Sequence, residues 1–179
     1  VLLGKSPVQF FELVWRGGFG TAFSFQNTLQ RAAPLILTGL AFAIPARIGL
    51  VMIGAEGALV IGGFAAAALA IPLVSAEAPA YLTMLLMVLV AMAAGGAWNA
   101  IAGWLKHSRG VNETISTLLL TYIAIAIMNF FVEGALRDPA SQNKPSTMPI
   151  GKDYMVGNIP GTDVHWGLVF GLVLAVALQ

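Results

Sequence analysis

Long apolar runs, separated by short charged stretches, dominate the chain. A bilayer core about 30 Å thick is crossed by about 20 apolar helical residues, so such runs are typical of membrane-spanning helices. The candidate spans are 32–46, 48–75, 78–105 and 114–132, followed by a run that begins near Trp166. The first of these runs is short, and the last is expected to be only the start of a span. The pattern predicts an all-α fold, a polytopic transmembrane helical bundle.

One carboxylate interrupts the second run: Glu56, in the stretch "GLVMIGAEGALV". If a helix began at Ile48, this carboxylate would lie about 12 Å along its axis, where its charge costs several kcal/mol unless it is paired or wetted. A broken or re-entrant helix around Gly49–Gly57 would instead let a new helix begin at Glu56, with the carboxylate at the positive helix end. Two roles stay open for Glu56. It is a structural cap or ion-pair partner, with Arg47 nearest in sequence, or it lines a path through the membrane.

Two amides, Asn99 and Asn129, lie inside the later spans. Buried amides in membrane helices hydrogen-bond to a neighbouring helix or line a polar path. Both interpretations stay open, so Asn99 and Asn129 join Glu56 as candidates for a translocation path. The span that contains Asn99 also carries small residues on which another helix is expected to pack: Ala93, Gly96, Ala97 and Ala100.

The stretch "GVNETIST" precedes the fourth span. Asn112 is a good N-cap residue, and Glu113 would follow in the first helical turn, where a carboxylate is favoured. Capping therefore explains the segment without a ligand. The alternative is that Asn112, Glu113 and Thr114 contact a cytoplasmic partner or form an inner gate.

Polar segments lie before and after these spans. Val1–Leu3 is interpreted as the end of a preceding span, and "PVQFFELVWRGGF", 7–19, as an amphipathic interfacial helix or a simple surface connector. Residues 133–165 contain four prolines and mixed charges, so they are expected to form a loop outside the membrane, with at most short helices.

Composition agrees with a membrane protein and gives little sign of catalysis. Hydrophobic residues make up 58% of the chain and charged residues 9%, and the mean hydropathy is +0.85. The net charge of +1 gives no reason to expect nucleic acid, and the absence of cysteine excludes thiolate chemistry. His107 and His165 fall in different predicted loops, and nothing pairs a nucleophile with a base. We therefore predict no catalytic residue, no metal site and no cofactor.

Three stretches resemble the membrane subunits of ATP-binding cassette importers of the branched-chain amino acid and simple-sugar permease superfamily. They are "TLQRAAPLILTGLAFAIPARIGLVMIGAEGALVIGGFAAA", "GAWNAIAGWLKHSRGVNETISTLLLTYIA" and "EGALRDPAS", in this order between about residues 28 and 137. The nucleoside and simple-sugar branch is the most similar. Two places depart from the usual nucleoside-type pattern. Met52 and Ala58 replace the Asn and Gln that flank "IGAEG", and Thr121 replaces the Asn of Asn-Tyr-Ile-Ala.

The resemblance implies a function. The chain would form half of the translocation path for a small polar solute, a nucleoside or simple sugar, and would work by alternating access in the bacterial plasma (inner) membrane. The implied partners are a homologous permease subunit, cytoplasmic ABC ATPase subunits that hydrolyse ATP, and an extracytoplasmic solute-binding protein. Two alternatives stay open: an ATP-independent secondary transporter or channel, and a purely structural membrane subunit, which the lack of a polar cavity would favour.

Charge and resemblance predict opposite orientations. With alternating spans, most basic residues lie on the side of the 133–165 loop, which the positive-inside rule would place in the cytoplasm. The resemblance places that loop outside and "KHSRGVNET", 106–114, in the cytoplasm. We follow the resemblance because the loop balances its basic residues with Glu133, Asp138, Asp153 and Asp163.

The predicted organisation is a single transmembrane permease domain, truncated at both ends. Residues 1–31 would hold the end of a preceding span and the interfacial helix, and 32–132 the core spans. Residues 133–165 would form an extracytoplasmic loop, and 166–179 the start of the next span.

Overall fold

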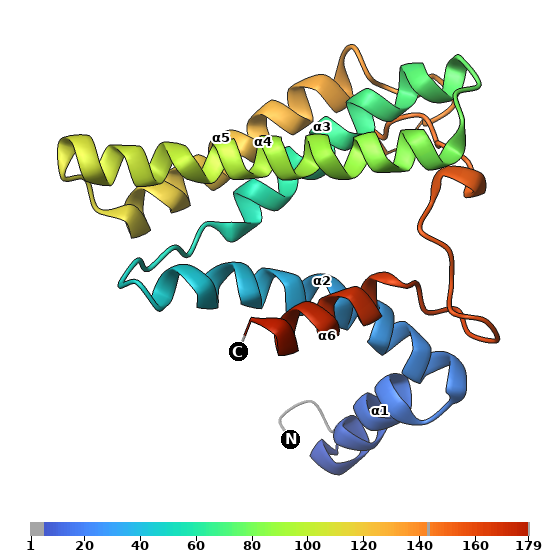
Figure 1. Ribbon diagram of the computed structural model, residues 1–179. Coiled ribbons are helices and arrows are strands. Elements are labelled where there is room, and N and C mark those ends of the chain that lie inside the picture. The colour runs from blue at the N-terminus through green and yellow to red at the C-terminus, as the bar shows by residue number, and fades with distance from the viewer. Residues whose placement is uncertain (1–5, 143, 179) are drawn as a thin grey trace. The chain divides into compact units, whose positions relative to one another are not determined.

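Two compact units make up the computed structural model, which describes residues 6–142 and 144–178. One unit contains the described residues of Val1–Leu40 and Val156–Gln179, and the other is Ala41–Met155. α-Helices dominate both units (Figure 1), which confirms the predicted all-α class.

The first unit contains α1 (Pro7–Phe19), α6 (Gly167–Ala177) and the first part of α2 (Ala22–Ala46). α1 has the bounds predicted for the amphipathic segment. Pro7 occupies its first position, where the missing N–H leaves no helical hydrogen bond unmade. The predicted end of a preceding span, Val1–Leu3, lies outside the described residues.

A small apolar core joins α6 to α2 within this unit. Its buried members are Ala33, Val164 and Leu168. Gly171 lies at this contact, where a Cβ would be in ordinary van der Waals contact with Ile36 and, at 3.7 Å, with the Ala33 carbonyl oxygen. α6 therefore lies along α2, as Figure 1 shows, and begins next to Trp166, where the sequence predicted a new helix.

α2 is longer than the predicted span 32–46. It begins at Ala22, directly after Thr21, whose hydroxyl oxygen accepts a hydrogen bond from the Ser24 N–H at 3.0 Å as an N-cap does. The predicted span began after Arg31 because a charged side chain is costly in the hydrocarbon core of a bilayer. A charged residue does not interrupt a helix, so the helix extends past the apolar run.

Three long helices run alongside one another in the second unit (Figure 1): α3 (Ala55–Ser75), α4 (Ala80–Arg109) and α5 (Glu113–Glu133). α4 and α5 contain most of the predicted spans 78–105 and 114–132. α2, α3, α4 and α5 are the four helices of the described chain that are long and apolar enough to cross a membrane.

Small residues bring α3 and α4 into contact. A Cβ at Gly62 would lie 2.9 Å from the Ala91 carbonyl oxygen, and one at Gly95 would lie 3.0 Å from that of Ala58. The α3–α4 contact uses a different face from the predicted one, because Gly95 rather than its neighbour Gly96 lies there, and one residue turns a helix by about 100°. Packing of another helix on the predicted face stays a prediction. The members of the predicted face are exposed: Ala93, Gly96, Ala97 and Ala100.

The long connection after α5 contains a short 3-10 turn, η1 (Lys152–Tyr154). The Tyr154 hydroxyl donates a hydrogen bond to the Ala78 carbonyl at 3.0 Å. This bond fixes the connection to the turn between α3 and α4. The predicted loop with short helices is thus present, with its single-turn helix at that end of the three-helix unit.

Candidate functional site

A non-helical segment separates α2 from α3. α2 ends at Ala46, and Gly49 follows with a left-handed φ of 78°, a conformation that favours glycine after a helix. The chain then stays out of helix until α3 begins at Ala55. The segment overlaps the predicted Gly49–Gly57, and a broken or re-entrant helix within the bilayer stays a prediction.

Side chains of α5 bind the backbone of this segment. The Val51 N–H donates a hydrogen bond to Glu113 Oε1 at 3.4 Å, and the Thr114 hydroxyl donates to the Val51 carbonyl at 2.8 Å. Farther along α5, the Thr121 hydroxyl donates to the Gly54 carbonyl at 3.4 Å. Irregular backbone is tolerated at membrane depth only where protein or water satisfies its polar groups. These contacts with α5 satisfy the Val51 N–H and the carbonyls of Val51 and Gly54.

Two glycines let the start of α3 touch the backbone of α5. A Cβ at Gly54 would overlap the Thr117 carbonyl, and one at Gly57 would lie 2.8 Å from the Cα of Thr121. Thr121 is buried and also donates a hydrogen bond to the Thr117 carbonyl at 2.9 Å. This departure from the nucleoside-type pattern is therefore a packing position in the fold.

The turn between α4 and α5 is held by its own polar residues. The Asn112 side chain accepts hydrogen bonds from the N–H groups of Thr114 at 2.9 Å and Ile115 at 3.3 Å, which confirms the predicted N-cap. Lys106 Nζ lies 2.7 Å from Glu113 Oε1, so an ion pair joins the two sides of the turn. These side chains bind their own chain, and their contact with a cytoplasmic partner stays a prediction.

Glu56 and Asn99 lie apart from these contacts. Glu56 is exposed in the first turn of α3, and its carboxylate makes no hydrogen bond or ion pair with the rest of the described chain. Asn99 is half-buried on α4. Among the residues that the structure describes, no three His, Asp or Glu side chains gather where they could hold a metal ion.

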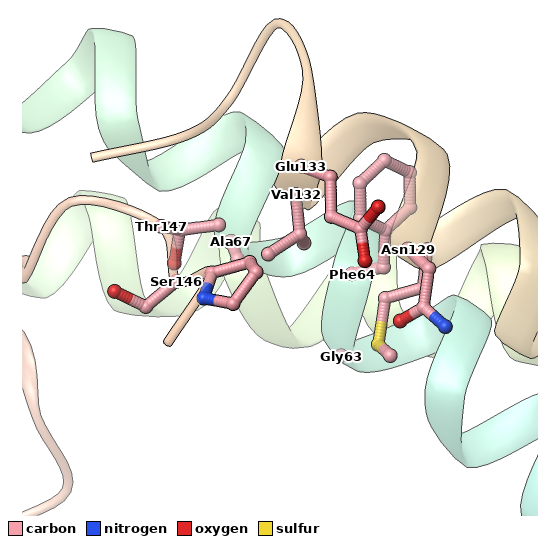
Figure 2. Close-up of a pocket in the computed structure, with 10 residues that line it drawn as sticks. Gly63, Phe64, Ala67, Asn129, Val132, Glu133, Ser146 and Thr147 are labelled. Carbon is pink, nitrogen blue, oxygen red and sulfur yellow. The ribbon is translucent and has the colours of Figure 1, made fainter. Parts of the chain in front are cut away.

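A pocket of about 460 Å³ opens between α3, α5 and residues 145–147 (Figure 2). Its volume falls within the roughly 300–1,000 Å³ of small-molecule sites. Its polar lining residues are Asn129, Glu133, Ser146 and Thr147, and its apolar ones are Gly63, Phe64, Ala67, Met128, Val132 and Pro145. Of the three residues predicted for a path, Asn129 lines this pocket, whereas Glu56 and Asn99 do not.

Comparison with known proteins shows the family to which the chain belongs. Residues 24–179 match the family described as "Branched-chain amino acid transport system / permease component". The chain belongs to this permease family.

Several relatives of this permease are named for the solute that they transport. The glucose ABC transporter permease protein of Haloferax volcanii is 33% identical over 99% of this chain and 48% of its own length. The guanosine ABC transporter permease protein of Bacillus subtilis is 30% identical over 98% of this chain and 50% of its own length. The nucleoside ABC transporter permease protein of Lactococcus lactis is 33% identical over 72% of this chain and 35% of its own length. The chain thus spans about half the length, or less, of these relatives, and no solved structure matches it.

Membership of the permease family agrees with the apolar helices. Four membrane-spanning candidates together with permease homologues make this a multi-pass protein of the plasma membrane. The predicted family, fold class and membrane location are therefore confirmed.

Sequence reasoning about this permease missed part of the pocket. Glu133 was assigned to the loop, although it follows Asn129 by four residues and so shares its helical face. That spacing is a signal that the sequence contains. Phe64, Ser146 and Thr147 carry no comparable signal, because only the folded chain brings α3 and the loop beside α5.

Proposed function

We propose that this chain is part of the membrane-spanning permease subunit of an ATP-binding cassette importer, where it forms half of the path for a nucleoside or a simple sugar. The observation that carries this proposal is the set of relatives. Two of them cover almost the whole chain, and they are named for glucose and guanosine. Both solutes carry a polyhydroxylated sugar ring, so one permease architecture can serve both.

The proposed partners follow from the family description as one component of a transport system. Cytoplasmic ABC ATPase subunits would hydrolyse ATP, a homologous permease subunit would complete the path, and an extracytoplasmic solute-binding protein would deliver the solute. The permease itself would perform no covalent chemistry. Its work would be to expose a weak solute site alternately to the two sides of the membrane.

We assign the turn between α4 and α5 to the cytoplasmic side and the pocket to the outer side. This assignment follows the family resemblance, and the short turn carries the basic residues Lys106 and Arg109 without an excess of acidic ones. Glu56 lies toward the cytoplasmic end of α3 in this orientation. Its exposure and its lack of a bonded partner among the described residues favour path lining over a cap or an ion pair.

The pocket supports a transport path over a purely structural membrane subunit. It lies between predicted spans and carries polar side chains, whereas a structural subunit needs no such space. No feature of the described chain specifically favours an ATP-independent channel or secondary transporter. The names of the relatives therefore support the ATP-driven importer.

Reconstitution tests this function. The complete gene product that contains this chain would be assembled in proteoliposomes with its ATPase and binding protein, and uptake of radiolabelled uridine and glucose would be followed. We expect uptake of at least one solute only when ATP is present, and its loss when the ATPase carries an inactivating substitution of its catalytic glutamate. Uptake that persists without ATP would overturn the proposal in favour of the secondary transporter or channel.

A further inference from the structure

Two polar side chains of α5 share one face above the pocket. Asn129 and Glu133 are four residues apart, which places them on adjacent turns of the same side of the helix. Both line the pocket, and Figure 2 shows the amide and the carboxylate on the same side of it, across from Ser146 and Thr147. The pocket therefore has an acceptor-rich side opposite two hydroxyl groups.

Glu133 has no evident structural task. It lies in the last turn of α5, which contains no basic residue, and the negative end of a helix disfavours a carboxylate. Neither Glu133 nor Asn129 makes a side-chain hydrogen bond or an ion pair with other residues in 6–142 and 144–178. Both side chains are exposed where they line the pocket, so neither is occupied by a protein partner and each can reach a ligand there.

An aromatic ring completes the pocket. Phe64 of α3 lines it, and the ring of Phe131 contacts the Phe64 ring in a tilted arrangement with a centroid separation of 5.3 Å. This contact joins the Phe64 ring to α5. An aromatic face suits the C–H surface of a sugar ring, whose hydroxyl groups point sideways toward polar groups.

We infer that this pocket binds the adjacent hydroxyl groups of a neutral polyol, such as the 2′,3′-diol of a ribonucleoside or a diol of a hexose. The Glu133 carboxylate accepts hydrogen bonds from the two hydroxyls, and the Asn129 amide donates to one of their oxygens. The same negative charge repels phosphorylated solutes. This inference rests on the proposed function, because it explains how glucose and nucleosides share one path.

Saturation-transfer-difference NMR on the complete gene product in nanodiscs, without ATPase or binding protein, detects such weak binding directly. The probes are uridine, 2′,3′-dideoxyuridine and glucose. For the wild type we expect saturation of the ribose protons of uridine and of the ring protons of glucose. Glu133→Gln should weaken uridine binding about tenfold, because hydrogen bonds to a charged acceptor are stronger than those to a neutral one. It should leave the weaker binding of 2′,3′-dideoxyuridine unchanged.

Controls separate this inference from folding and from the proposed function. Glu77→Gln makes the same chemical change at an exposed carboxylate outside the pocket and should leave uridine binding unchanged. Asn129→Ala should weaken uridine binding in the same direction as Glu133→Gln. Equal loss for uridine and its dideoxy analogue, or no loss in either pocket variant, would overturn the diol site. ATP-driven uptake in the reconstituted system would still stand in that case, whereas diol binding without ATP-driven uptake would overturn only the importer.

Discussion

The two ends of the contact between α3 and α5 differ in how they are filled. At the start of α3, Gly54 and Gly57 let the backbones meet, and the buried Thr121 hydroxyl donates hydrogen bonds to the Gly54 and Thr117 carbonyls. Farther along the same pair, the helices leave a pocket of about 460 Å³ in which Asn129 and Glu133 have no partner among the described residues. We call the end of this helix pair at Gly54 and Gly57, with the adjoining turn between α4 and α5, the closed end. We call the end at the pocket the open end.

Under the proposed function, both ends would serve one transport path. A path that opens to one side at a time needs a sealed part and an accessible part. Glycine provides the seal because it removes the side chain that would separate the helices, and threonine hydroxyls satisfy the irregular backbone. At the open end the Phe64 and Phe131 rings are in contact, and the pocket beside them carries the polar side chains of Asn129 and Glu133. We therefore expect substitutions at the closed end to affect folding and those at the open end to affect solute binding.

The largest effect is expected for Gly54→Ala. The added Cβ would overlap the Thr117 carbonyl, which is backbone and cannot turn away. Overpacking of this kind should lower the free energy of unfolding by about 3 kcal/mol. The yield of monodisperse protein and its thermal midpoint measure this effect. Gly96→Ala is the matched control, because a Cβ there has no atom within 4 Å and the yield should not fall.

A smaller loss is expected for Asn112→Ala at the same closed end. The substitution removes the side-chain oxygen that accepts hydrogen bonds from the N–H groups of Thr114 and Ile115. Loss of an N-cap typically lowers the free energy of unfolding by about 1 kcal/mol. Asn112→Ser retains a capping oxygen and should keep the wild-type thermal midpoint within error. If the alanine and serine variants melt together, the cap does not stabilise this end.

The smallest effect on stability is expected for Glu56→Gln. The exposed carboxylate has only the helix end to interact with among the described residues, and that interaction contributes about 0.5 kcal/mol. The thermal midpoint should therefore change little, while uptake falls if Glu56 lines the path. A large drop in thermal midpoint would instead show that Glu56 belongs to the closed end as a cap or ion-pair partner.

Features that depend on local sequence were predictable. Pro7 and the apolar residues after it set the bounds of α1, and Asn112 set the start of α5, because capping and periodicity act within a few residues. The pairing of faces was not predictable from such rules. Gly95 and Gly96 are equally small, and only the position of α3 decides which one lies at the contact. Glu113 was placed correctly in the first turn, yet its bonds to Lys106 and Val51 depend on the folded chain.

Thiol labelling tests the central claim that the closed end faces the cytoplasm and the open end faces outside. Single cysteines at Ser108, beside the turn between α4 and α5, and at Ser146, on the pocket, would be introduced into a complete gene product freed of any other cysteine. An impermeant maleimide would be applied to intact cells and then to permeabilised ones. We predict that Ser146→Cys reacts in intact cells, and that Ser108→Cys reacts only after permeabilisation. Labelling of Ser108→Cys but not Ser146→Cys in intact cells would contradict the account.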